Sequence, residues 1–180
     1  MVFTPSPGNP SDDSALGANV EIWNKATGGG SAITLGRVVV RTDATGNCAE
    51  ATDGSFGRFG VVARLYPNYD ATTATGTINV DSSSKVAVIC GSNAKVYVTC
   101  TGSIPAGSRV VAGTTGTVKA YVESAWTSTT PGDFQSPLRE FEKIVGVYEG
   151  HYGESEQAAG SAPTAATTGQ VVRIKLGVFT

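Results

Sequence analysis

The chain has 180 residues, a length that suits one domain or one domain with an extended arm. Glycine is frequent, at 23 residues, and only 16% of the residues are charged, which favours short strands and tight turns over helices. The formal net charge of −2 offers no basic footprint for nucleic acid and no polybasic patch for an anionic membrane. Since no apolar run approaches a membrane span and the opening MVFTP lacks the features of a signal peptide, we expect a soluble protein made in a cytoplasm.

The first 20 residues differ in composition from the rest. Residues 1–20 contain three prolines and two glycines, which predicts an extended N-terminal arm without a core of its own. Val2, Phe3 and Leu16 are apolar points along this arm, as expected of an extended peptide that anchors in pockets of a partner. Residues 21–180 predict a single β domain.

The first half of the domain predicts strands at 20–23, 33–41, 47–52, 59–65, 77–80 and 85–90. Gly36 indicates a turn or bulge inside the second of these. We expect 47–52 to pair with 33–41 across the turn 43–46, and the strongly apolar 59–65 to be a central strand. We also expect a hairpin between 77–80 and 85–90, closed by the serine-rich turn 81–84.

The second half predicts three short strands at 94–101, 108–112 and 117–122, joined by tight turns around Pro105-Ala106-Gly107 and Gly113–Gly116. Apolar residues alternate with polar ones over 96–101, the period of a half-buried strand. Further strands are expected at 144–148 and 171–179, with loops at 126–137 and 149–168 and one helical turn at 136–138. The whole pattern predicts an all-β fold, a small β-barrel or β-sandwich of about ten short strands.

A short pattern recurs in three of these strands. Residues 59–62 read FGVV, 145–148 read VGVY and 176–179 read LGVF. A glycine in mid-strand indicates a bulge or a close approach of two backbones. A repeated structural unit and a shared strand composition both explain the pattern, and the sequence leaves both explanations open.

The three cysteines are an odd number without a Cys-x-x-Cys spacing. If residues 91–94 turn a hairpin, Cys100 lies about 16 Å beyond the position that faces Cys90, at about 3.3 Å per residue. That distance exceeds the Cα separation of about 7 Å that a disulfide tolerates. We therefore expect Cys48, Cys90 and Cys100 to be buried free thiols.

No group of residues indicates an enzyme. His151 is the only histidine, and we expect the glutamates around it, at 149, 154 and 156, to form a solvated acidic loop rather than a metal site. A Gly-x-Ser-x-Gly elbow is absent, and the glycines at 54, 57 and 60 do not have the spacing of a phosphate-binding loop. We expect no catalytic residue, cofactor or metal. Among the aromatic residues, Trp126 in its polar loop is the best candidate for an exposed contact.

Three phrases of the sequence resemble the small β-rich capsid decoration proteins of tailed viruses, also called cement or head-stabilising proteins. They are GVVA at 60–63, the run 96–121 with its GSIPAG turn, and the late IVGV strand with the closing VRIKL. The loop 126–137 departs from a minimal version of this pattern. The resemblance implies a non-enzymatic structural protein of a bacteriophage virion, located on the outer capsid surface. It also implies the major capsid protein as partner, a homotrimer on the shell, and Val2, Phe3, Leu16 and Trp126 as capsid-interface candidates.

Two other functions stay open. A viral tail, fibre or surface-adhesion module belongs to the same structural class. An all-β trimeric nucleotide hydrolase is the alternative from a different class, but it would need an acidic metal-and-substrate motif and a glycine-rich phosphate-binding tail. Residues 171–180 predict a strand instead of such a tail.

Overall fold

The structure, a computed structural model, describes residues 19–25, 32–41, 44, 46–66, 77–78, 85–91, 94–122, 140–151 and 164–177, without the side chains of 64–66, 77–78 and 151. The regular structure of the described residues is nearly all β-strand, which confirms the predicted fold class. The strands of the first half are β1 (Asn19–Lys25), β2 (Ile33–Thr34), β3 (Val38–Arg41), β4 (Asn47–Glu50), β5 (Phe59–Tyr66), β6 (Thr77–Ile78) and β7 (Lys85–Cys90). Those of the second half are β8 (Lys95–Thr99), β9 (Arg109–Ala112), β10 (Val118–Ala120), β11 (Ile144–His151) and β12 (Val171–Leu176), with the 3₁₀ turn η2 (Thr114–Gly116) before β10.

The first half forms a closed five-stranded barrel, which we call the first unit. Its strand order is β1-β4-β3-β5-β7, and β7 returns to β1. All of these neighbours are antiparallel except β1 and β4, which run parallel where Lys25 meets Cys48. A closed barrel leaves no long unpaired edge that could template aggregation.

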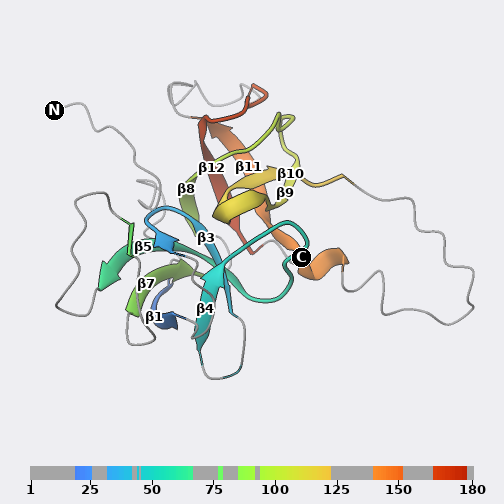
Figure 1. Cartoon of the computed structure of the whole chain (residues 1–180). Helices are drawn as coiled ribbons and strands as arrows, with labels where there is room; N and C mark the ends of the chain where they lie inside the picture. The colour runs from blue at the N-terminus through green and yellow to red at the C-terminus, as the bar shows by residue number, and fades with distance from the viewer. Residues whose placement is uncertain are drawn as a thin grey trace, which may run out of the picture.

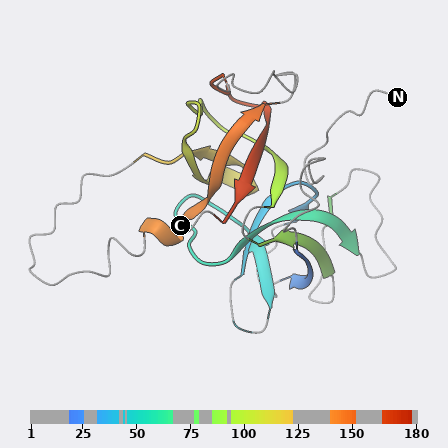
Figure 2. The ribbon, with the colours of Figure 1, turned by 180° about the vertical axis from the view of Figure 1, so that it is seen from behind.

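The second half, which we call the second unit, forms a five-stranded sheet of order β10-β9-β11-β12-β8. Its two outer strands approach each other, because Cys100 at the end of β8 forms a parallel bridge with Val118 of β10. The amide of Thr101 donates to the Val118 carbonyl at 2.8 Å across the same junction. Figures 1 and 2 show the two units side by side, one formed by β1 to β7 and the other by β8 to β12.

The two units repeat one topology. Replacing β1, β4, β3, β5 and β7 by β8, β10, β9, β11 and β12 converts the first strand order into the second, including the parallel contact between the first strand and the return strand of the hairpin. The pair of β2 with β6 also has a counterpart, the antiparallel bridge between Ile104 and Ala166. A glycine with positive φ precedes the hairpin in both units, Gly36 at 75° and Gly107 at 70°.

The register of the pairs agrees as well. Gly60 of β5 lies opposite Val39 of β3, and Gly146 of β11 lies opposite Val110 of β9. The register of β5 against β7 shifts just after Val62, and that of β11 against β12 shifts just after Tyr148. The FGVV and VGVY phrases thus occupy equivalent strands, which favours a repeated unit as their explanation. The third phrase, LGVF, begins at the last residue of β12 and is not part of this equivalence.

The buried side chains form two groups, one inside the first unit and one shared by both units. The interior of the first barrel contains Trp23, Ile33, Val39, Cys48, Val62, Val86, Val88 and Cys90. A larger core joins the interior of the second unit to the outward faces of β3, β5 and β7 of the first, through Val38, Val40, Val61 and Ile89. Backbone hydrogen bonds from Gly116 to the Ala51 carbonyl, 2.8 Å, and from Gly57 to the Glu142 carbonyl, 3.1 Å, reinforce the contact.

Most predicted strands are confirmed, including 59–65 as a central strand between β3 and β7. The predicted hairpin between 77–80 and 85–90 is wrong: the described pairing of β6 is with β2, while β7 lies between β5 and β1. The strand at 144–148 extends to His151, into the segment expected to be a loop. The predicted helical turn at 136–138 and the arm up to residue 18 lie outside the described residues, and Asn19 and Val20 already belong to β1.

Candidate interaction surface

The four residues predicted to contact a capsid, Val2, Phe3, Leu16 and Trp126, all lie outside the described residues. The residues that flank these two segments in the sequence are described. The arm leads directly into β1, and the loop that holds Trp126 leaves the body at Val122 and returns to it at Glu140. We therefore looked for exposed apolar side chains near β1 and near residues 122 and 140.

Strand β1 presents apolar side chains to solvent. Val20 is 62% exposed and Ile22 is 54% exposed, while Trp23, on the opposite face of the strand, is 2% exposed and buried inside the first barrel. The neighbouring positions on β7 are Ile89 and Ala87, which are buried. Val20 and Ile22 thus extend the apolar outward face of the first unit beyond the part that the second unit covers.

A second exposed apolar group lies where the two units meet. Phe56 and Phe141 are 56% and 46% exposed. The hydrogen bond from Gly57 to the Glu142 carbonyl brings the loop of Phe56 next to the turn of Phe141. The guanidinium of Arg109 lies 5.9 Å from the Phe141 ring centre, within the range of a cation–π contact. Phe141 lies close to residue 140, where the description of the chain resumes after 123–139, and Val122, the last residue described before that range, is 81% exposed.

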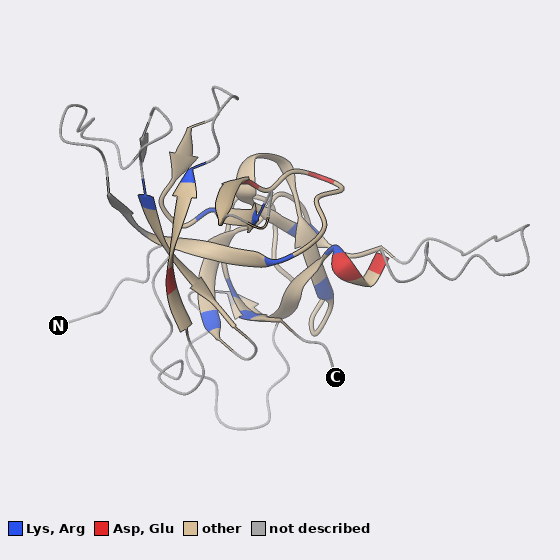
Figure 3. Ribbon diagram, turned by 90° about the horizontal axis from the view of Figure 1, so that it is seen from below, with Lys and Arg blue, Asp and Glu red and all other residues tan. Residues whose placement is uncertain are grey.

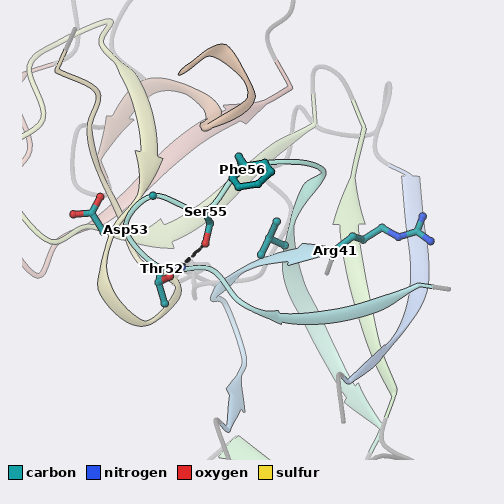
Figure 4. Close-up of a pocket in the computed structure, with 7 residues that line it drawn as sticks. Arg41, Thr52, Asp53, Ser55 and Phe56 are labelled. Carbon is teal, nitrogen blue, oxygen red and sulfur yellow. Dashed lines mark hydrogen bonds between the residues drawn. The ribbon is translucent and has the colours of Figure 1, made fainter. Parts of the chain in front are cut away.

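An open hollow of about 420 Å³ lies beside Phe56, lined by Val40, Arg41, Thr52, Asp53, Gly54, Ser55 and Phe56. Its polar groups do not converge on one point (Figure 4). The Thr52 amide donates to Ser55 Oγ at 2.9 Å, closing the turn, and Lys119 binds Asp53 Oδ2 at 2.6 Å. Arg41 points away and donates to the Ala44 carbonyl at 3.3 Å. The hydrogen bond from Lys119 lowers the pKa of Asp53 below its ordinary value.

Of the residues around His151 that we considered as metal ligands, the structure describes the side chain of Glu149. Within the described part of the chain no group of three or more His, Cys, Asp and Glu side chains could hold a metal ion. Glu149 lies instead between two cations, 3.5 Å from Lys95 and 3.8 Å from Arg173. The side chain of His151 and the residues 154 and 156 are outside the described set.

The prediction of three buried free thiols is confirmed. Burial raises the pKa of Cys48 to about 12 and that of Cys90 to about 11, and it also raises the pKa of Cys100. The thiols are therefore protonated at neutral pH and poor nucleophiles. The hairpin from which we derived their separation is absent, because β7 and β8 belong to different units.

Sequence reasoning missed the surroundings of Trp23. The indole N–H donates to Glu21 Oε2 at 2.9 Å, and the guanidinium groups of Arg41 and Arg58 each lie 5.8 Å from the ring centre. The Trp23 hydrogen bond, assisted by Arg58, lowers the pKa of Glu21. These four residues come from two strands and a loop, so only the barrel closure brings them together.

The fold and these surfaces define an all-β protein of two units that share one topology. No helix among the described residues is long and apolar enough to cross a membrane. No family model matches the sequence, and no curated protein matches it. Among solved structures, the chain is similar to the N base of head fibre gp8.5 of bacteriophage phi29, with 13% identity and a TM-score of 0.45 over 88% of this chain and 95% of that chain. A likeness this distant does not assign a function to the chain.

Proposed function

We propose that the chain is a non-enzymatic structural protein that binds the outer surface of a viral capsid and stabilises the shell, with the major capsid protein as its partner. The observation that carries the proposal is the exposed apolar face of β1. Its residues Val20 and Ile22 follow the proline-rich arm in the sequence and belong to a strand of the closed barrel. Exposed apolar residues at one place on a protein surface indicate an interaction site. The resemblance to decoration proteins names the partner.

The architecture suits this role physically. The shared core and the backbone hydrogen bonds between the units make one body that resists local opening. A protein that binds only the assembled shell stabilises it by mass action, because disassembly must first release the bound protein. An arm that orders on contact adds interface area at the cost of conformational entropy.

The proposal gives the protein two contact regions. Val2, Phe3 and Leu16 of the arm would bind the shell together with Val20 and Ile22 of β1. Trp126 would bind it together with the exposed pair of Phe56 and Phe141. Copies of the chain would gather as a homotrimer around a symmetry axis of the shell. A reconstruction of the decorated particle tests both the contacts and the symmetry.

We expect the purified protein to sediment with assembled, expanded shells and not with free capsid subunits. The reason is that a decoration protein recognises surfaces that only neighbouring subunits in a shell create. The measurement is co-sedimentation with expanded shells, immature shells and free subunits, followed by thermal rupture of decorated and bare shells. Equal binding to all three samples, or unchanged rupture temperature, would contradict the proposal, as would clear hydrolysis of a nucleotide in the presence of magnesium.

Deleting residues 2–18 should weaken binding to expanded shells at least tenfold, which corresponds to about 1.4 kcal/mol. The thermal unfolding of the body should hardly change, because β1 begins at Asn19 and keeps its pairs with β7 and β4. Binding isotherms and unfolding midpoints of both proteins provide the comparison. Unchanged affinity would mean that the arm is a solvated tail, and a large loss of body stability would mean that it is an integral part of the fold.

A further inference from the structure

The internal repeat allows the same sheet face to be compared in the two units. In the first unit, one row of outward side chains crosses β3, β5, β7 and β1 in register, namely Val38, Val61, Ile89 and Val20. The first three are 0%, 0% and 2% exposed and pack in the core shared with the second unit. This face of the first unit is thus a docking face.

The equivalent row of the second unit is cationic. It crosses β9, β11, β12 and β8 through Arg109, Val147, Lys175 and Lys95, again in register. Arg109 is exposed and the other three are partly exposed. We call these four residues the cationic row. Figure 3 shows blue Lys and Arg positions on strands of both units, and red Asp and Glu positions on the short helical turn that begins at Glu140, on a strand and on loops.

The residues next to the cationic row leave it positive. Arg173 lies two positions from Lys175 on β12 and faces Tyr97 of β8. Glu149 approaches both Lys95 and Arg173 but supplies only one negative charge. Among the described residues of β8, β9, β11 and β12, this face therefore carries four cations, at 95, 109, 173 and 175, against one carboxylate.

The cross-strand pair at the end of the row brings two like charges together, with the Glu149 carboxylate 3.5 Å from one of them, Lys95. Lys95 and Lys175 lie directly opposite each other on antiparallel strands. Like charges in this position destabilise a sheet. Positive charges gathered at one place on a surface favour a partner that carries negative charges.

We propose that the cationic row is an interaction surface for a carboxylate-rich protein surface. Opposite charges on the partner would offset the repulsion between Lys95 and Lys175, and Tyr97 and Val147 provide the aromatic and apolar contacts of a protein interface. A protein partner is favoured over nucleic acid because the partly exposed side chains of Tyr97 and Val147 lie among the cations, and aromatic and apolar contacts are typical of protein interfaces rather than of a phosphate backbone. Such binding does not require that the partner be a capsid.

The test uses the full chain and poly-L-glutamate as the probe, near neutral pH and at low salt. A chain of net charge −2 should repel this polymer unless a local cationic surface binds it. We expect saturable binding that weakens as salt is added. The double variant Lys95→Glu/Lys175→Glu should bind at least tenfold more weakly. The variant Lys85→Glu, which reverses an exposed cation on β7 of the first unit, should bind like the original protein.

Any of the following results would overturn the proposal: no binding of polyglutamate by the original protein, unchanged affinity in the folded double variant, equal loss in the Lys85→Glu control, or tighter binding of duplex DNA or anionic vesicles that the double variant abolishes. The last result would assign the surface to phosphate ligands instead. Circular dichroism establishes that the variants are folded. If the double reversal unfolds the chain, Lys95→Gln/Lys175→Gln removes the same two charges without adding new carboxylates beside Glu149. Retained polyglutamate affinity in that variant would equally overturn the proposal.

Discussion

Replacing Gly146 by alanine is expected to lower the free energy of unfolding by about 3 kcal/mol, the upper part of the range for overpacking. A Cβ atom at this position would lie 2.1 Å from the carbonyl oxygen of Lys175 and 3.2 Å from the Cα of Leu176. Both are backbone atoms of the neighbouring strand β12, whose pairing with β8 and β11 holds it in place. Relief therefore requires separation of two paired strands in the second unit.

Urea or thermal denaturation followed by circular dichroism measures this effect. The control is Gly169→Ala, because Gly169 has a φ of +86° and no atom within 4 Å of an added Cβ. That substitution should cost only the left-handed backbone strain of about 1–2 kcal/mol. Equal losses in the two variants would show that the close approach of β11 to β12 is not what requires glycine at 146.

Gly60 of the first unit shows how far the repeat extends into packing. A Cβ atom there would lie 2.2 Å from Val88 Cγ1 and 2.9 Å from the Ile89 carbonyl oxygen. Two equivalent strands thus require glycine for the same reason, a neighbouring strand that approaches too closely for a side chain. The sequence pattern of a glycine within an apolar strand indicated this approach, although it could not identify which strand made it.

The strands themselves were largely predictable because their signals are local. Alternation in β8 and β12, and turn residues such as Gly36 and Gly107, fix burial and chain reversal within a few residues. The pairing of strands was less predictable. Residues 91–94 have the composition of a hairpin turn, yet they connect β7 of one unit to β8 of the other. The partners of these strands, β1 and β5 for β7 and β12 for β8, are set by pairing between residues far apart in sequence.

The candidate surfaces depend even more on long-range structure. The cationic row consists of residues from four strands, and only the register of those strands brings Arg109, Lys175 and Lys95 into line. Net charge conceals it, since the chain as a whole is slightly acidic. The exposed positions of Val20 and Ile22 were equally hidden, because alternation in β1 shows that two faces exist but not which of them the second unit covers.

Replacing Trp23 by alanine should cost about 3–5 kcal/mol, the range for removing a large aromatic side chain from a core. Trp23 is 2% exposed in the interior of the first barrel, and the substitution would also leave Glu21 without its hydrogen bond from the indole. Trp23→Phe is the matched control, since it keeps most of the buried volume but removes the N–H donor. It should cost clearly less than the alanine variant.

The unfolding of the Trp23→Ala variant also reports on how the repeat is assembled. Because the outward face of the first barrel is part of the core of the second unit, loss of the first should expose Val38, Val61 and Ile89 and remove the packing surface of the second. We therefore expect one cooperative transition at a lower midpoint, and the same single transition for Ile174→Ala in the second unit, which should lose about 2–5 kcal/mol. Calorimetry gives the measurement, because two resolved transitions, only one of them shifted by each variant, would show that the units fold independently. A single transition would mean that the two units unfold as one cooperative body, so that the apolar face of β1 and the cationic row belong to the same folding unit.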